Sequence, residues 1–316
     1  MRSQALAALC LGFMSPSAHA ASTVAPIMAQ YQEREQRLQD IGWRLVHGNA
    51  RFCTETRLSI GLTLQDMAGF GSPDAARVAL GLSRYFAVQS AAAGSPSALA
   101  GLSANLEVRS IAGTDPNRWP AEERRDWRRL TRAHDLIDAE LAKIGAVELA
   151  LEGPQSTLAV RGEMICATRF ELASNSKDAK AEGARVIIGE TFIGFTYQDE
   201  ELAAAIAHEL AHNLLRHRAW LDANGRKRKD IRLTEREADR LMPWLLANAG
   251  YDPAAASRFM QQWGPGHDRG IFRARTHDGW DERLEAISAE VALVEDQMRD
   301  SGAADWKQRF RREISD

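Results

Sequence analysis

The chain has 316 residues, of which 45% are hydrophobic and 26% charged, and its formal net charge at pH 7 is −3. This composition fits a folded protein of about two domains, each large enough to bury a core. A nearly balanced charge gives no electrostatic reason to bind nucleic acid or an anionic membrane, so neither class of partner is expected. After the first residues, no stretch of the sequence reaches the ~20 apolar residues that a membrane-spanning helix requires.

The first twenty residues have the pattern of a secretory signal peptide. Arg2 gives a short positive start, residues 5–14 form an apolar core, and Ala-His-Ala at 18–20 fits the small-x-small rule for cleavage. We therefore expect residues 1–20 to be a signal peptide. The product would be exported and, in a Gram-negative cell, periplasmic, either soluble or peripheral to the envelope. The alternative is an ordinary N-terminal helix.

Residues 21–57 are expected to form an N-terminal helical segment that packs on the later peptidase domain. Apolar residues recur there at helical spacing, and the pattern extends from about residue 24 to 52. Export would also place Cys53 and Cys166 in an oxidising compartment. They bracket a segment whose ends are expected to lie close together, so we favour a disulfide between them over two buried thiols.

Residues 58–165 have the pattern of short strands separated by glycine. Strands are predicted at 58–64, 84–88, 106–113, 146–151 and 156–161, and a helix at about 133–144. Gly145 is placed to end that helix. The segment 114–131, which carries two tryptophans and many charges, is interpreted as an insert.

This order of elements resembles a bacterial PDZ domain. Gly-Ser-Pro at 94–96, Ala-Gly-Leu at 100–102 and Ile-Ala-Gly at 111–113 match the family pattern, whereas 104–105 is Ala-Asn where the family has Gly-Asp. The resemblance implies a domain that adds an extended peptide to a sheet edge, with its carboxylate loop near 59–62. Such a PDZ-like module would position substrates or bind envelope proteins. A β-rich spacer without a ligand is the alternative.

A third composition begins near Cys166. Residues 185–195 are β-branched and aromatic and predict a strand. A helix rich in alanine and leucine is predicted at 199–215, because three acidic residues stand at its dipole-favoured start. A second helix is predicted at about 233–249. The expected fold class is therefore α+β, with residues 166–316 forming a mainly helical domain that contains a small β-sheet.

The first of these helices carries the motif His208-Glu209-x-x-His212. Positions four apart lie about 40° apart around a helix axis, so both histidines face the same way and can bind one zinc ion per chain. Glu209 lies about 100° round, where it can reach the water that such a site activates, and it is the candidate general base. With 8 histidines in 316 residues, a chance occurrence of the motif has a probability on the order of 1%.

The third ligand is not the histidine of the metzincin pattern. A catalytic zinc usually has three protein ligands and one open position. Arg218 stands where a metzincin carries its third histidine. His217 would lie about 180° from His208 on a continuous helix, so it is expected to face away.

Glu235, on the next predicted helix, is the best candidate for the third ligand. Asp239 follows four residues later on the same face and is placed to hydrogen-bond the non-ligating nitrogen of a zinc histidine. Glu237 lies about 200° from Glu235 and is expected to point elsewhere.

Residues 166–290 resemble the HtpX/BepA/Oma-type gluzincin metalloendopeptidases, which include the CAAX prenyl proteases. The resemblance rests on residues 200–213, Glu-x-x-Ala-Asp at 235–239, Ala-Gly-Tyr-Asp-Pro at 249–253, and Thr276-His277 with Arg283 beyond. It implies that Glu235 is the third zinc ligand. It also implies that His277 either stabilises the tetrahedral intermediate or occupies the open metal position in a resting form. Asp278 stands where the family has proline, and a surface-loop histidine is the alternative.

The sequence thus predicts an exported zinc metalloendopeptidase that hydrolyses protein substrates, with envelope protein quality control as the expected setting. Glu209 would take a proton from the attacking water and return it to the leaving amine. The resemblance implies that the substrate lies extended along an edge strand, for which 185–195 is the candidate. Two alternatives are a peptide-binding or chaperone-like protein with a latent or structural zinc site, and an aminopeptidase.

Overall fold

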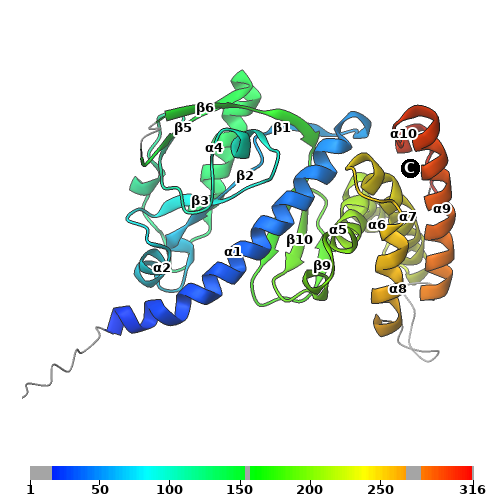
Figure 1. Ribbon diagram of the computed structural model, residues 1–316, viewed down its shortest axis with the longest axis horizontal. Helices are drawn as coiled ribbons and strands as arrows, with labels where there is room; N and C mark the ends of the chain where they lie inside the picture. Colours follow the sequence, from blue (N-terminus) through cyan, green and yellow to red (C-terminus); the bar gives the residue numbers. More distant parts are fainter. Residues whose placement is uncertain (1–15, 154–156, 268–278, 315–316) are drawn as a thin grey trace, which may run out of the picture.

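The computed structural model describes residues 16–153, 157–267 and 279–314. A long helix, α1 (Pro16–Gly48), runs diagonally between a β-rich half and a mainly helical half (Figure 1). Within the described part of the chain, no helix is both long and apolar enough to cross a membrane. α1 begins before the expected cleavage point after Ala20. The apolar core of the expected signal peptide lies outside the described residues.

The β-rich half holds seven strands and three α-helices. The strands are β1 (Thr56–Ser59), β2 (Leu62–Asp66), β3 (Phe86–Ala91), β4 (Val108–Ile111), β5 (Ala146–Leu151), β6 (Thr157–Arg161) and β7 (Glu163–Cys166), and the helices are α2 (Pro73–Leu80), α3 (Pro96–Leu99) and α4 (Arg128–Ile144). β1 pairs with β7, β2 with β3, and β4-β5-β6 form a third sheet, all antiparallel. Apolar positions of α4 at helical spacing, Ala133, Ile137 and Leu141, face the core of this half. Gly145 ends α4 at φ +74°, as predicted.

Three local features of this half differ from the sequence predictions. The strand predicted at 58–64 is two strands, because Gly61 takes φ +66° between them and packs closely on Ser95. α2 was not predicted, although Ser72, Pro73 and Gly81 are typical of a helix start and stop. The end of the predicted insert, from residue 128, belongs to α4.

The helical half contains a small sheet and six helices. These are β8 (Arg169–Ala173), β9 (Ala179–Ala181), β10 (Arg185–Gly189), α5 (Asp199–Leu214), α6 (His217–Asn224), α7 (Arg228–Asn248), α8 (Ala255–His267), α9 (Trp280–Ser301) and α10 (Trp306–Arg309). Four short 3-10 turns complete the described elements: η1 (Ala50–Phe52), η2 (Met67–Gly69), η3 (Pro116–Arg118) and η4 (Ile193–Thr196). α5 is buried on nearly every side, and its small residues, such as Ala203 and Ala207, are fully enclosed.

The expectation that residues 185–195 offer a free sheet edge is wrong. The strand ends at Gly189, and β10 lies in the centre of the sheet, parallel to β8 and antiparallel to β9. The outer side of β8 is covered by α1, where Gln39 donates to Phe170 O at 2.8 Å and Tyr31 donates to Leu172 O at 2.8 Å. β9 is the other edge strand of this sheet, with Lys180 exposed and Ala179 and Ala181 half-buried.

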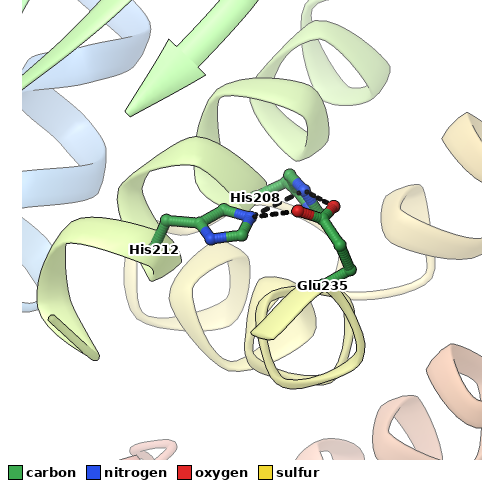
Figure 2. A group of neighbouring side chains, drawn as sticks. All are labelled: His208, His212 and Glu235. Atoms are coloured by element: carbon green, nitrogen blue, oxygen red, sulfur yellow. Dashed lines mark hydrogen bonds and ion pairs between the residues drawn. The ribbon is translucent and has the colours of Figure 1, made fainter. Parts of the chain in front are cut away.

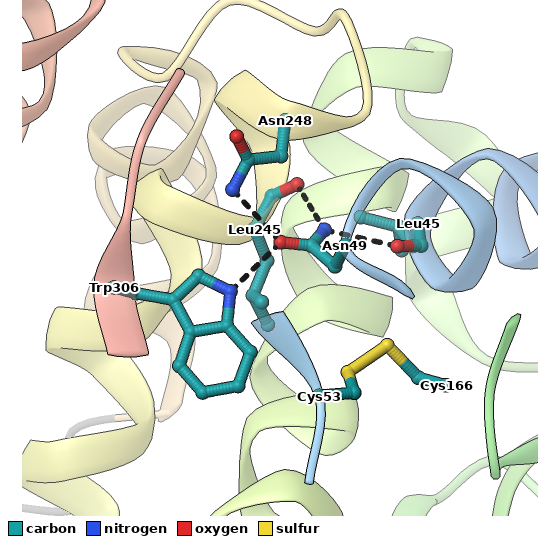
Figure 3. The surroundings of a disulfide bond; sticks show 7 residues. All are labelled: Leu45, Asn49, Cys53, Cys166, Leu245, Asn248 and Trp306. Carbon is teal, nitrogen blue, oxygen red and sulfur yellow. Dashed lines mark hydrogen bonds between the residues drawn. A yellow bond between two sulfur atoms is a disulfide. The ribbon is translucent and has the colours of Figure 1, made fainter. Parts of the chain in front are cut away.

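A disulfide joins Cys53, just after η1, to Cys166 at the end of β7, as predicted, with the two Cα atoms 5.5 Å apart (Figure 3). Beside it, the fully buried Asn49 amide donates to Leu45 O at 2.9 Å and to Leu245 O at 3.0 Å. Its oxygen accepts from Asn248 at 3.0 Å and from Trp306 at 2.9 Å. One satisfied amide thus ties together α1, α7 and α10.

Candidate metal centre

α5 supplies a rigid platform for two of the candidate ligands. Its first turn carries acidic residues at the dipole-favoured end, and Arg258 of α8 holds two of them through hydrogen bonds to Glu200 and Glu201. Because the helix is enclosed by the surrounding core, His208 and His212 cannot move without moving their neighbours.

His208 and His212 of α5 point toward Glu235 of α7 (Figure 2). Their Nε2 atoms are 3.2 Å apart. The Glu235 carboxylate spans them, with Oε2 3.4 Å from His208 Nε2 and Oε1 3.5 Å from His212 Nε2. The structure therefore brings together the three residues that the sequence singled out as metal ligands.

The donor set and its spacing fit a zinc ion. Tetrahedral zinc binds imidazole nitrogen and carboxylate oxygen at about 2.0–2.1 Å, which separates neighbouring ligand atoms by about 3.3 Å. The separation of the two histidine nitrogens, 3.2 Å, lies close to this value, and one oxygen of Glu235 lies at 3.4 or 3.5 Å from each of them. Side-chain exposures of 11%, 14% and 18% show that His208, His212 and Glu235 are each partly accessible to solvent.

The second nitrogen of His208 faces a buried acid. His208 Nδ1 lies 3.0 Å from Asp239 Oδ1, although the contact lacks the geometry of a regular hydrogen bond. Asp239 is in turn held by Arg283 of α9 through bonds of 2.6 and 2.7 Å. Burial opposes ionisation of Asp239, but Arg283 and His208 keep its pKa below the usual range.

The electrostatics of the two histidines differ. Burial alone lowers the pKa of His208, but the carboxylates of Asp239 and Glu235 outweigh it and raise this pKa to about 10. Burial lowers the pKa of His212 to about 3. The two carboxylates thus favour positive charge at His208, which is the electrostatic environment that a cation requires.

One expectation about the neighbours of these ligands was wrong. His217 does not face away: its Nδ1 lies 2.9 Å from His212 Nδ1, and its Nε2 lies 3.0 Å from Glu237 Oε2. The reason is that α5 stops at Leu214 and Arg216 adopts φ +57°, so that His217 starts a new helix, α6, in a different direction. Glu237 does point away from the triangle, as expected, and is fully buried behind His217.

A further residue of this group was not anticipated at all. Arg312, near the C-terminus, donates to Glu237 Oε2 through Nε at 3.2 Å and Nη2 at 3.1 Å. Burial raises the pKa of Glu237, but hydrogen bonds from His217, Ile314 N and Arg312 outweigh it and lower this pKa to about 2. In the sequence, Glu237 follows Asp230 and Thr234 at helical spacing, and all three side chains are buried on α7. That spacing of polar residues is only a weak indication of burial.

Of the two candidate catalytic residues, Glu209 lies within the described part of the chain and His277 does not. Glu209 follows His208 on α5 and is partly exposed, in contrast to the buried residues around it. His277 lies outside the described residues, so the structure gives no position for it.

Comparison with known proteins adds one finding. Residues 172–229 match the sequence model of peptidase family M48. The match indicates a metallopeptidase. The M48 segment contains α5 and α6 with both histidines, and it ends before Glu235, which the structure brings to them. Neither the curated proteins nor the solved structures gave a match.

Proposed function

We propose that this chain is an exported, zinc-dependent metalloendopeptidase that hydrolyses peptide bonds of protein substrates, with envelope protein quality control as its setting. The proposal depends above all on the triangle of His208, His212 and Glu235, a two-histidine, one-carboxylate donor set whose ligand atoms lie close enough to hold one zinc ion. The M48 match over residues 172–229 supports the same chemistry. The disulfide between Cys53 and Cys166 supports an oxidising compartment.

Some residues of the site would bind the metal, and others would transfer the proton. Bound there, zinc supplies Lewis-acid chemistry for amide hydrolysis. Glu209 is the general base, which takes a proton from the attacking water and delivers it to the leaving amine. Asp239 orients His208. His277 is proposed to stabilise the tetrahedral intermediate or to occupy the open position at rest.

β9 replaces residues 185–195 as the proposed docking strand for an extended substrate. It is an edge strand of its sheet and packs beside α5. Asn213, one residue after His212, accepts a bond from Gly183 N at 2.7 Å and so ties the β9–β10 turn to the ligand helix. A peptide added to β9 would run past the metal triangle with its backbone paired.

The β-rich half, residues 58–165, is proposed as a PDZ-like module that positions substrates. β2 pairs with β3 on one side only, and its other side faces α4. There Leu64 N lies 3.4 Å from His134 Nε2, a long bond that an incoming peptide carbonyl can replace. In the expected carboxylate loop, one backbone donor is already hydrogen-bonded within the protein, because Gly61 N donates to Ser59 Oγ at 3.1 Å.

The Glu209→Gln variant tests the activity. We expect the purified wild-type chain with zinc to cleave an unfolded protein such as casein, and Glu209→Gln to bind zinc equally but not cleave. Glu295→Gln, an exposed glutamate on α9, is the matched control and should cleave normally. Equal activity of Glu209→Gln and wild type would disprove the role of this base. Cleavage restricted to peptides with a free N-terminus would replace endopeptidase by aminopeptidase.

A further inference from the structure

A chain of buried polar groups runs from His212 to the C-terminal residues and is not part of the ligand triangle. It consists of His217, which is 1% exposed, Glu237, which is 0% exposed, and Arg312. We propose that His217 and Glu237, anchored by Arg312, form a positioning chain that fixes the tautomer of His212 and presents its Nε2 to the metal. This inference rests on the proposed metal site.

The Glu237 carboxylate is surrounded by backbone and guanidinium donors. Oε1 accepts from Glu313 N and, at 2.9 Å, from Ile314 N. Oε2 accepts from Arg312 at 3.1 Å and faces His217 Nε2 at 3.0 Å. A carboxylate saturated in this way only accepts hydrogen bonds, so His217 must carry its hydrogen on Nε2.

The hydrogen on His217 Nε2 determines what its other nitrogen does. A neutral imidazole with Nε2–H has a lone pair on Nδ1, and this atom lies 2.9 Å from His212 Nδ1. His212 must therefore donate from Nδ1, which leaves the lone pair of its Nε2 free. That lone pair is the one directed at His208 and Glu235. The opposite arrangement would place an unprotonated nitrogen 3.0 Å from the Glu237 oxygen in a buried site.

Arg312 joins this chain to the backbone that separates α5 from α6. Its Nη2 donates to Glu237 and, at 3.2 Å, to Leu215 O at the end of α5. One guanidinium thus holds both Glu237 and the junction that turns His217 back toward His212. The neighbouring Glu313 is fixed by Arg236 at 2.8 Å and Arg240 at 3.0 Å, so the C-terminal segment is secured on α7. Residues 312–314 therefore support the metal centre from outside the M48 segment.

The test is the zinc affinity of the full chain, measured by competition with a chromophoric chelator. We expect His217→Leu to weaken zinc binding about 10- to 100-fold, the range found when outer partners of metal histidines are removed. His217→Gln should restore most of the loss, because its amide can accept from His212 and donate to Glu237. Deleting residues 312–316 should weaken binding in the same direction. The absorption spectrum of the cobalt-substituted chain reports whether the ligand geometry has changed.

A matched pair of buried glutamates separates positioning from general packing. Glu237→Gln should weaken zinc binding, whereas Glu290→Gln should not. Glu290 is 4% exposed and bonds to Arg240 and Trp244, away from His212. The proposal is overturned if His217→Leu binds zinc like the wild type, or if Glu290→Gln weakens binding as much as Glu237→Gln. A wild-type chain that binds no zinc would overturn the metal site itself, and this inference with it.

Discussion

Replacing Asp239 by alanine is expected to damage stability and zinc binding by two separate routes. Asp239 is 1% exposed and binds Arg283 through two bonds of 2.6 and 2.7 Å. Removing one partner of such a buried pair costs about 3–5 kcal/mol of unfolding free energy. The same change removes the acid 3.0 Å from His208 Nδ1, and we expect zinc affinity to fall about 10- to 100-fold.

The double variant Asp239→Ala/Arg283→Met separates these two routes. Arg283 is 8% exposed, and a methionine of similar length removes its charge from the buried site. Replacing both members of a buried ion pair by apolar groups is often neutral, so stability should return to within about 1–2 kcal/mol of the wild type. Zinc affinity should stay low, because His208 still lacks its acid.

Both quantities can be measured on the same preparations. Urea unfolding in the presence of a chelator gives the stability of the metal-free chain, and chelator competition gives the zinc affinity. If the double variant recovered wild-type zinc affinity, Asp239 would act through Arg283 alone and its role as an orienting acid would be refuted. A stability loss below about 1 kcal/mol in Asp239→Ala would refute the buried-pair argument.

Two further predictions concern stability. Burial raises the pKa of Glu35 from 4.5 to about 7, so the unfolded chain binds fewer protons than the folded chain between these pH values. The stability that protonated Glu35 contributes to the folded state is therefore fully present below pH 4.5 and is lost as the pH rises through 7. The free energy of unfolding falls by up to about 3 kcal/mol over this range. Glu35→Gln should remove this part of the pH dependence, so the stability difference between variant and wild type in urea unfolding should change between pH 4.5 and 8. A pH-independent difference would contradict this. Replacing Cys53 and Cys166 by alanine removes a disulfide between positions 113 residues apart. The chain-entropy model predicts that the free energy of unfolding falls by about 4–5 kcal/mol. A loss under about 1 kcal/mol would show that the unfolded chain keeps these two positions close together without the disulfide.

The ligand triangle could be predicted because it depends on regular helices. His208 and His212 lie four apart within the uninterrupted α5, and Glu235 and Asp239 lie four apart within the uninterrupted α7. In both cases the spacing determines which side chains share a face. The spacing alone did not predict that α7 packs against α5. That proximity was inferred only from the residue types, which are those of metal ligands.

The outer groups could not be predicted, because they depend on a break and on distant partners. The segment Leu214-Leu215-Arg216 has no glycine or proline, so the local sequence does not predict that α5 ends before His217. The burial of Glu237 depends on Arg312, which lies 75 residues away. Similarly, β10 has the composition of a strand, but its central place in the sheet is set by β8 and β9 on either side.

The break at Arg216 is itself testable, because a left-handed residue other than glycine carries a conformational cost. Arg216 is exposed and takes φ +57°, where an L-residue costs roughly 1–2 kcal/mol. Arg216→Gly removes this cost but adds freedom to the unfolded chain, so we expect a stability change between about zero and +1 kcal/mol with zinc affinity unchanged. Arg216→Val should destabilise the chain by at least about 1 kcal/mol and weaken zinc binding, because a β-branched residue resists this turn and His217 follows it directly. Urea unfolding and chelator competition on both variants decide the matter. Equal zinc affinities for the glycine and valine variants would mean that His217 is held by Glu237 alone and that the turn plays no part in aligning the site.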